Sequence, residues 1–102
     1  MPHLIIDYSA NLENAVDMAG LCDVLRVKAI GLDVFPAAGV RVRAIAANHY
    51  SIADGNPAHG YIDVSVRLRA GREMTAKKAA IEALFQVARD FIAPVMAHQP
   101  IA

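Results

Sequence analysis

Three different spacings of apolar side chains follow one another along the first half of the chain. A short apolar run over residues 4–8 begins almost at the first residue and predicts a strand. Apolar side chains then recur at helical spacing over residues 16–32, which predicts an amphipathic helix that Gly31 ends. Over residues 40–47 the period falls to two, so we expect a second strand with arginines along one face.

The segments between these elements carry turn residues. Ser9, Asn11 and Asn14 supply turn and helix-capping chemistry after the first strand. Proline and glycine punctuate residues 35–39, and the run Asp-Gly-Asn-Pro at residues 54–57 predicts a loop. We therefore expect irregular connections at these three places.

The second half begins with the most regular alternation in the sequence, over residues 61–69. Its apolar and polar members fall on opposite faces of the predicted strand, with Ile62, Val64, Val66 and Leu68 on one face and Asp63, Ser65, Arg67 and Arg69 on the other. We expect Thr75 to cap a long helix whose apolar stripe runs from Ile81 to Val95. Pro94 is expected to bend or shorten the last turn of that helix.

The predicted order of elements is strand, helix, strand, then strand and helix, and no convincing strand follows Met96. The first three elements form a β-α-β unit, whose strands should be parallel and whose crossover should be right-handed. The sequence therefore predicts an α/β fold with two helices packed on one face of a small mixed sheet. A length of 102 residues predicts a single domain spanning residues 1–102.

The composition favours self-association and argues against binding to nucleic acid or insertion in a membrane. Hydrophobic residues make up 56% of this short chain and charged residues only 20%, so we expect surplus apolar side chains at a homo-oligomer interface. A formal net charge of zero gives no field that would attract nucleic acid. No apolar run approaches the roughly 20 residues of a membrane span, and the N-terminus does not resemble a signal peptide. Because the single cysteine, Cys22, cannot form an internal disulfide, we expect a cytoplasmic location.

Proline at position 2 is the first candidate for catalytic chemistry. A small residue there permits removal of Met1, which would leave a secondary amine on a rigid ring. An α-amino group has a pKa of about 8, and an apolar pocket or nearby arginines would lower that pKa further. Such a group suits proton transfer near neutral pH. A proline that merely starts a strand is the alternative, and on Met-Pro alone it is the commoner one.

Four short segments, in the same order, carry a resemblance to a known family. They are Met1-Pro2-His3-Leu4-Ile5-Ile6, Phe35-Pro36-Ala37-Ala38-Gly39-Val40-Arg41-Val42-Arg43, Ala53-Asp54-Gly55 and Ala70-Gly71-Arg72. Each segment is weak alone, but together they span most of the chain. They resemble the 5-carboxymethyl-2-hydroxymuconate Δ-isomerase family of the tautomerase superfamily.

The resemblance implies a tautomerase-like β-α-β fold and a homotrimer with its sheets inward and its helices outside. It also implies an isomerase in the breakdown of aromatic acids that requires no metal or organic cofactor. The imino nitrogen of Pro2 would move a proton between carbon atoms of a small anionic substrate, an unsaturated hydroxy or keto di- or tricarboxylate. Arg41 and Arg72 match the family motif and would bind its carboxylates, because a guanidinium holds a carboxylate bidentately and stabilises developing negative charge.

Two features depart from the family pattern. If Met1 is retained, the nitrogen of Pro2 is an amide without a basic lone pair, and the chain would be inactive. The family has one more strand after the second helix, and residues 98–102 do not supply it. Without that strand we expect a sheet edge that needs other cover.

The same residues allow other interpretations. We expect Arg43, Arg67 and Arg69 to form a solvated strand face or interface ion pairs rather than part of a site. The four histidines lack the spacing of zinc ligands, and Cys22 lacks the local signature of a nucleophile. Two alternative functions stay open: a tautomerase of another keto-enol acid such as phenylpyruvate, and a non-catalytic oligomer with a blocked N-terminus.

Overall fold

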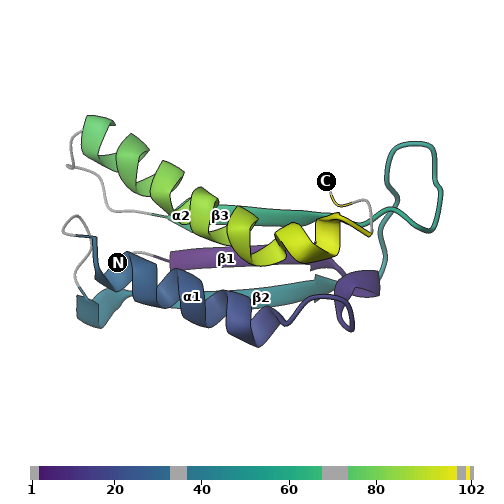
Figure 1. Cartoon of the computed structure of the whole chain (residues 1–102), viewed down its shortest axis with the longest axis horizontal. Helices are drawn as coiled ribbons and strands as arrows, with labels where there is room; N and C mark the ends of the chain where they lie inside the picture. Colours follow the sequence, from purple (N-terminus) through teal and green to yellow (C-terminus); the bar gives the residue numbers. More distant parts are fainter. Residues whose placement is uncertain (1–2, 33–36, 68–73, 99–100, 102) are drawn as a thin grey trace.

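The computed structural model describes residues 3–32, 37–67, 74–98 and 101, in which two helices pack on a three-stranded sheet (Figure 1). The strands are β1 (His3–Ser9), β2 (Arg41–Ala47) and β3 (Ile62–Arg67); the helices are α1 (Met18–Ile30) and α2 (Met74–Met96), with 3-10 turns over Ala10–Leu12 and Ala37–Gly39. The strand order is β2-β1-β3, so β1 is central, parallel to β2 and antiparallel to β3. The predicted mixed sheet and the parallel strands of the β-α-β unit are confirmed.

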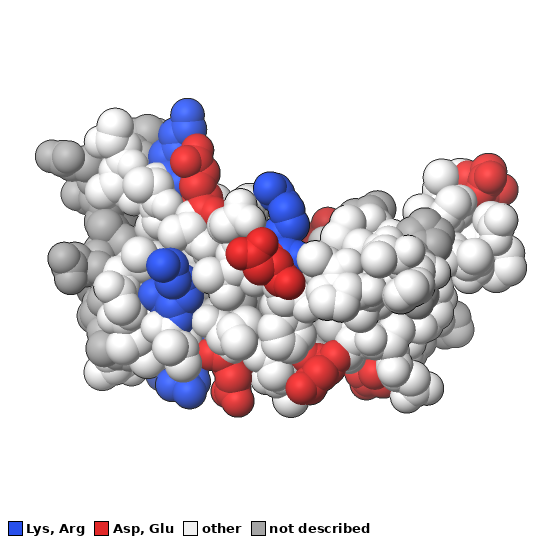
Figure 2. Space-filling model, in the orientation of Figure 1, with Lys and Arg blue, Asp and Glu red and all other residues white. Residues whose placement is uncertain are grey.

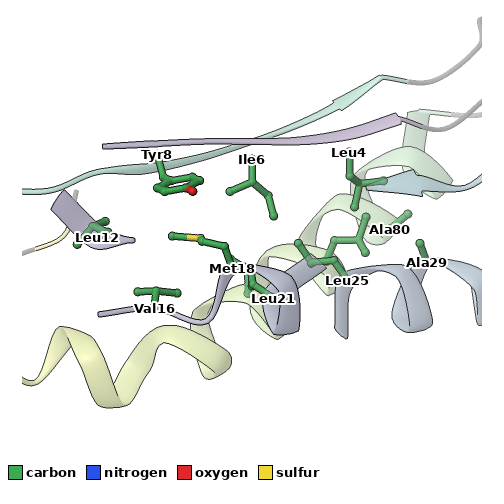
Figure 3. Packing of buried hydrophobic residues seen from close by; sticks show 12 residues of the cluster. Leu4, Ile6, Tyr8, Leu12, Val16, Met18, Leu21, Leu25, Ala29 and Ala80 are labelled. Atoms are coloured by element: carbon green, nitrogen blue, oxygen red, sulfur yellow. The ribbon is translucent and has the colours of Figure 1, made fainter. Parts of the chain in front are cut away.

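The core fills the space between one face of the sheet and both helices. In Figure 3 the side chains of alternate β1 residues point from the strand toward α1. The buried cluster draws on β1, both helices and the segment that joins β1 to α1: Leu4, Ile6, Tyr8, Leu12, Val16, Met18, Leu21, Leu25, Ala29, Ala80, Leu84 and Ala88. This arrangement confirms the predicted α/β architecture, and the described residues leave the other face of the sheet uncovered.

α1 begins at an N-cap that the sequence analysis did not identify. The side chain of Asp17 accepts a hydrogen bond from the N–H of Gly20 at 3.0 Å, which satisfies one of the free donors of the first turn. At the other end the N–H of Gly31 bonds to the carbonyls of Val27 and Lys28. Gly31 is therefore the C-cap of α1, as its position in the sequence predicts.

Two of the residues expected to cap α1 instead hold the connection between β2 and β3. Ser9 is completely buried, and its hydroxyl accepts a hydrogen bond from the N–H of Tyr61 at 3.0 Å. The side-chain amide of Asn11 donates to the carbonyl of His59 at 2.7 Å. These contacts join residues about half the chain apart, so local spacing alone does not reveal them.

The connection itself contains the predicted turn over residues 54–57. Gly55 has a φ of +85°, a conformation that favours glycine, and the carboxylate of Asp54 accepts a hydrogen bond from the N–H of Asn56 at 3.0 Å. The imidazole Nε2 of His59 lies 2.8 Å from the same carboxylate oxygen. The hydrogen bond from Asn56 and the one with His59 lower the pKa of Asp54.

α2 differs from its predicted form at its N-terminal end. It begins at Met74, so Thr75 lies inside the first turn and the prediction of Thr75 as the N-cap is wrong. At the other end the helix extends two residues past Pro94, to Met96, so Pro94 lies in its last turn. Beyond α2, Ile101 makes an isolated parallel bridge to Gly60, next to the start of β3.

The visible surface carries both signs of charge. Figure 2 shows basic side chains in the left and central parts of the face seen in Figure 1, and acidic side chains from there across to the right end. The pair Arg26–Asp23 on α1 is exposed, with 3.7 Å between its nitrogen and oxygen, and such pairs contribute little stability. In the parts of the chain that the structure describes, neither helix has the length and hydropathy of a membrane span.

Candidate active site

One end of the sheet brings basic residues of all three strands together. β1 and β2 both begin there, and β3 ends there. His3, the first residue of β1, pairs with Arg41 in the parallel ladder and with Arg67 in the antiparallel ladder. His3 therefore lies between two arginines, one on each neighbouring strand.

All three side chains belong to the face of the sheet that the helices leave open. Successive strand residues point to opposite faces, and Leu4, the residue after His3, is completely buried toward the helices. The register then puts His3, Arg41 and Arg67 on the opposite face. Arg41 and Arg67 are exposed there, and His3 is half-buried. This outcome confirms the prediction that the arginines of β2 line one face of a strand.

The open face changes its charge along the strands. Arg43 lies one pleat further along β2 than Arg41, on the same face. At the far end of the strands Asp7 and Asp63 are cross-strand partners, and the hydroxyl of Tyr61 donates to Asp7 at 2.8 Å. The face is therefore cationic where β1 begins and anionic where β1 ends.

Within the described residues, no carboxylate neutralises the cationic end. Among the described residues, the guanidinium groups of Arg41 and Arg67 form no ion pair with a carboxylate. Two strand spacings put their Cα atoms about 10 Å apart, with His3 between them. Arginine recognises carboxylates through its planar fork of donors. Unpaired arginines that flank one strand terminus can therefore hold a small molecule that carries more than one carboxylate.

The other two predicted site residues, Pro2 and Arg72, lie outside the described residues. Pro2 is bonded to His3, and Arg72 falls in the chain between the end of β3 at Arg67 and the start of α2 at Met74. In Figure 1, α2 starts at the end of the molecule where β1 and β2 also begin. Of the three predicted site residues, the structure therefore describes only Arg41.

Three cavities among the described residues lie elsewhere. They occupy about 380 Å³ between β3 and the two helices, about 400 Å³ within the β2–β3 connection and about 480 Å³ beside the start of α1. None of the three is lined by Arg41 or Arg67. The third contains Cys22, and burial raises the pKa of its thiol, which disfavours the nucleophilic thiolate. No group of three metal-ligating side chains is present within the described parts of the chain.

Comparisons with known proteins cover the whole chain. A profile of the 5-carboxymethyl-2-hydroxymuconate isomerase family matches residues 2–102. The 5-carboxymethyl-2-hydroxymuconate Delta-isomerase of Escherichia coli is 28% identical over 102 residues, which are 100% of this chain and 81% of that protein.

Two solved structures have the same fold. A crystal structure of 5-carboxymethyl-2-hydroxymuconate delta-isomerase superimposes with a TM-score of 0.94 at 33% identity, over 100% of this chain and 78% of that one. A 5-carboxymethyl-2-hydroxymuconate isomerase from Deinococcus radiodurans R1 gives a TM-score of 0.90 at 30% identity, over 99% of this chain and 76% of that one. The chain belongs to the 5-carboxymethyl-2-hydroxymuconate isomerase family and is an isomerase.

Proposed function

We propose that the protein shifts a proton on 5-carboxymethyl-2-hydroxymuconate, or on a close hydroxy or keto polycarboxylate, with the amino group of Pro2 as acid and base. The observation that carries this proposal is the position of Arg41, exposed and unpaired among the described residues beside His3, the residue bonded to Pro2. A full-length match to the isomerase family supports the same reaction.

The chemistry follows from the two kinds of group. A free secondary amine at Pro2 removes the proton of the 2-hydroxyl group of the dienol, and the electron pair that stays behind on oxygen is delocalised as a dienolate. Arg41 and Arg72 bind the carboxylates and stabilise the negative charge of that intermediate. The ammonium form of Pro2 then returns the proton to a carbon of the dienolate, which leaves a ketone, so that the reaction consumes no other reactant. Cations near a free amine favour its unprotonated form, which is the form that can accept a proton at neutral pH.

A homotrimer is part of the proposal. The sheet face that the helices leave open carries two apolar side chains, Ile5 of β1 and Ile45 of β2, and Ile45 is 50% exposed. It also carries arginines at one end and aspartates at the other, so the face can match a second copy in both polarity and charge. A second copy that covers this face would supply side chains that enclose the substrate, which a single chain does not provide. Gel filtration at micromolar concentration should therefore give three times the chain mass of 10.9 kDa, and elution at monomer mass would contradict the trimer.

Arg41→Ala tests the proposed site. Ultraviolet absorbance follows conversion of the dienol substrate, and loss of one carboxylate contact should reduce kcat/KM about 10- to 100-fold. Arg26→Ala is the control, because Arg26 is exposed on α1, away from the open face, and its loss should leave kcat/KM unchanged. An Arg41→Ala protein with the kcat/KM of the unmodified chain would remove Arg41 from the site. If the protein converts only the enol of phenylpyruvate, the proposed substrate is wrong, but Pro2 remains the proposed base.

A further inference from the structure

The proposed substrate has one more negative charge than the two predicted arginines can neutralise. Muconate is a six-carbon dienedioate with a carboxylate at each end, and the carboxymethyl branch adds a third. All three are ionised at neutral pH, since carboxyl groups have pKa values of about 4. Arg41 and Arg72 supply two guanidinium groups for three carboxylates. One more cation would balance the charge of the third carboxylate.

The sheet register supplies a third arginine. Arg67 is the cross-strand partner of His3 on β3, as Arg41 is on β2, and both lie on the open face. The alternation of residues 61–69 is typical of a solvated strand face, and the exposure of Arg67 agrees with that. The alternation along β3 does not reveal which residue of the next strand lies beside Arg67. The antiparallel pairing of β3 with β1 shows that this residue is His3, which is bonded to Pro2.

Arg67 also has no competing partner nearby on its own strand. Asp63 lies on the same face of β3, but four residues of extended strand separate their Cα atoms by about 13 Å. In the part of the chain that the structure describes, Arg67 forms no ion pair. The side chains of Asp7 and Asp63 lie together at the opposite end of β1. No carboxylate among the described residues therefore competes with a bound anion for the guanidinium of Arg67.

We propose that Arg67 determines specificity by binding the carboxymethyl carboxylate of the substrate. This proposal rests on the proposed function, because it names the third contact of the same site. The three arginines then divide the trianion between them: Arg41 and Arg72 take the two muconate carboxylates, and Arg67 takes the branch. Arg67 touches no reacting carbon, so it acts on substrate affinity rather than on proton transfer.

The test compares two acids that differ only in the branch. Arg67→Gln and the unmodified chain are assayed on 5-carboxymethyl-2-hydroxymuconate and on 2-hydroxymuconate, which lacks the carboxymethyl group. For the first acid kcat/KM should fall about 10- to 100-fold, mainly through KM, because one charge-assisted contact is lost. For the second acid the change should stay below about threefold, since only a longer-range, screened charge is removed. Arg67→Lys should recover part of the loss.

Arg26→Gln is the control, because Arg26 is exposed on α1, away from the open face, and its loss should leave the ratio of the two kcat/KM values unchanged. Equal losses on both acids for Arg67→Gln, or no loss on the trianion, would overturn the proposal. Calorimetric binding of both acids in a Pro2→Ala background separates this outcome from failure of the proposed function, because it needs no turnover. In that background Arg67→Gln should weaken the binding of 5-carboxymethyl-2-hydroxymuconate but not of 2-hydroxymuconate. Unchanged binding of the first acid would refute the role of Arg67.

Discussion

Pro2→Ala should lower kcat about 100-fold while KM for the substrate stays nearly constant. A positioned acid or base contributes roughly 10²- to 10⁴-fold to proton transfer, and we expect the lower part of that range because alanine still presents a primary amine. KM should hold because the arginines that bind the carboxylates are unchanged. Initial rates from ultraviolet absorbance give both constants.

Two controls make the Pro2→Ala result interpretable. Intact mass must show that Met1 has been removed from both proteins, because a retained methionine would block either amine. Far-ultraviolet circular dichroism must show that both proteins are folded to the same extent. Turnover at the rate of the unmodified chain, with both controls satisfied, would mean that the ring nitrogen is not the base.

Leu25→Ala is expected to lower the free energy of unfolding by about 2 to 5 kcal/mol. Leu25 lies on α1, is 0% exposed and belongs to the buried cluster between the helices and the sheet. Removing its branched end deletes apolar burial and leaves a cavity that close-packed neighbours fill only in part. Domains of this size are stable by only about 5 to 15 kcal/mol, so the loss is a large share of the total.

Val27→Ala on the same helix is the matched control. Val27 is 60% exposed, so its truncation should change the free energy of unfolding by less than about 0.5 kcal/mol. Urea unfolding of both variants at one fixed protein concentration measures the difference, since an oligomer makes apparent stability depend on concentration. If Leu25→Ala and Val27→Ala cost the same, the description of the core is wrong.

The strands and their faces were predictable because period-two alternation has a direct physical cause. Residues 41–47 and 62–67 each need one face against the helices, so their apolar residues repeat every second position, and Arg41, Arg43 and Arg67 fall on the other face. The ends of the helices were harder to predict, because a cap depends on the backbone geometry of a single residue. Asp17 caps α1 although three other polar residues in the preceding turns are equally plausible in sequence.

The candidate site was predictable only in part. Pro2, Arg41 and Arg72 follow from the resemblance of short segments to a known family, and the structure adds the place of Arg41 beside His3. Arg67 could not be assigned from its own strand, because a solvated strand face and a binding face have the same alternation. Only the antiparallel register of β3 on β1 reveals that Arg67 and Arg41 flank the same residue.

The state of the Pro2 nitrogen can be measured and varied directly. One protein is the chain with Met1 removed, and the other carries an added glutamate between Met1 and Pro2, so that the ring nitrogen is an amide. Intact mass verifies each N-terminus, and both are assayed on 5-carboxymethyl-2-hydroxymuconate. We predict turnover for the free proline and a rate at least about 100-fold lower for the extended chain. Equal rates for the two proteins would contradict catalysis by the N-terminal amine.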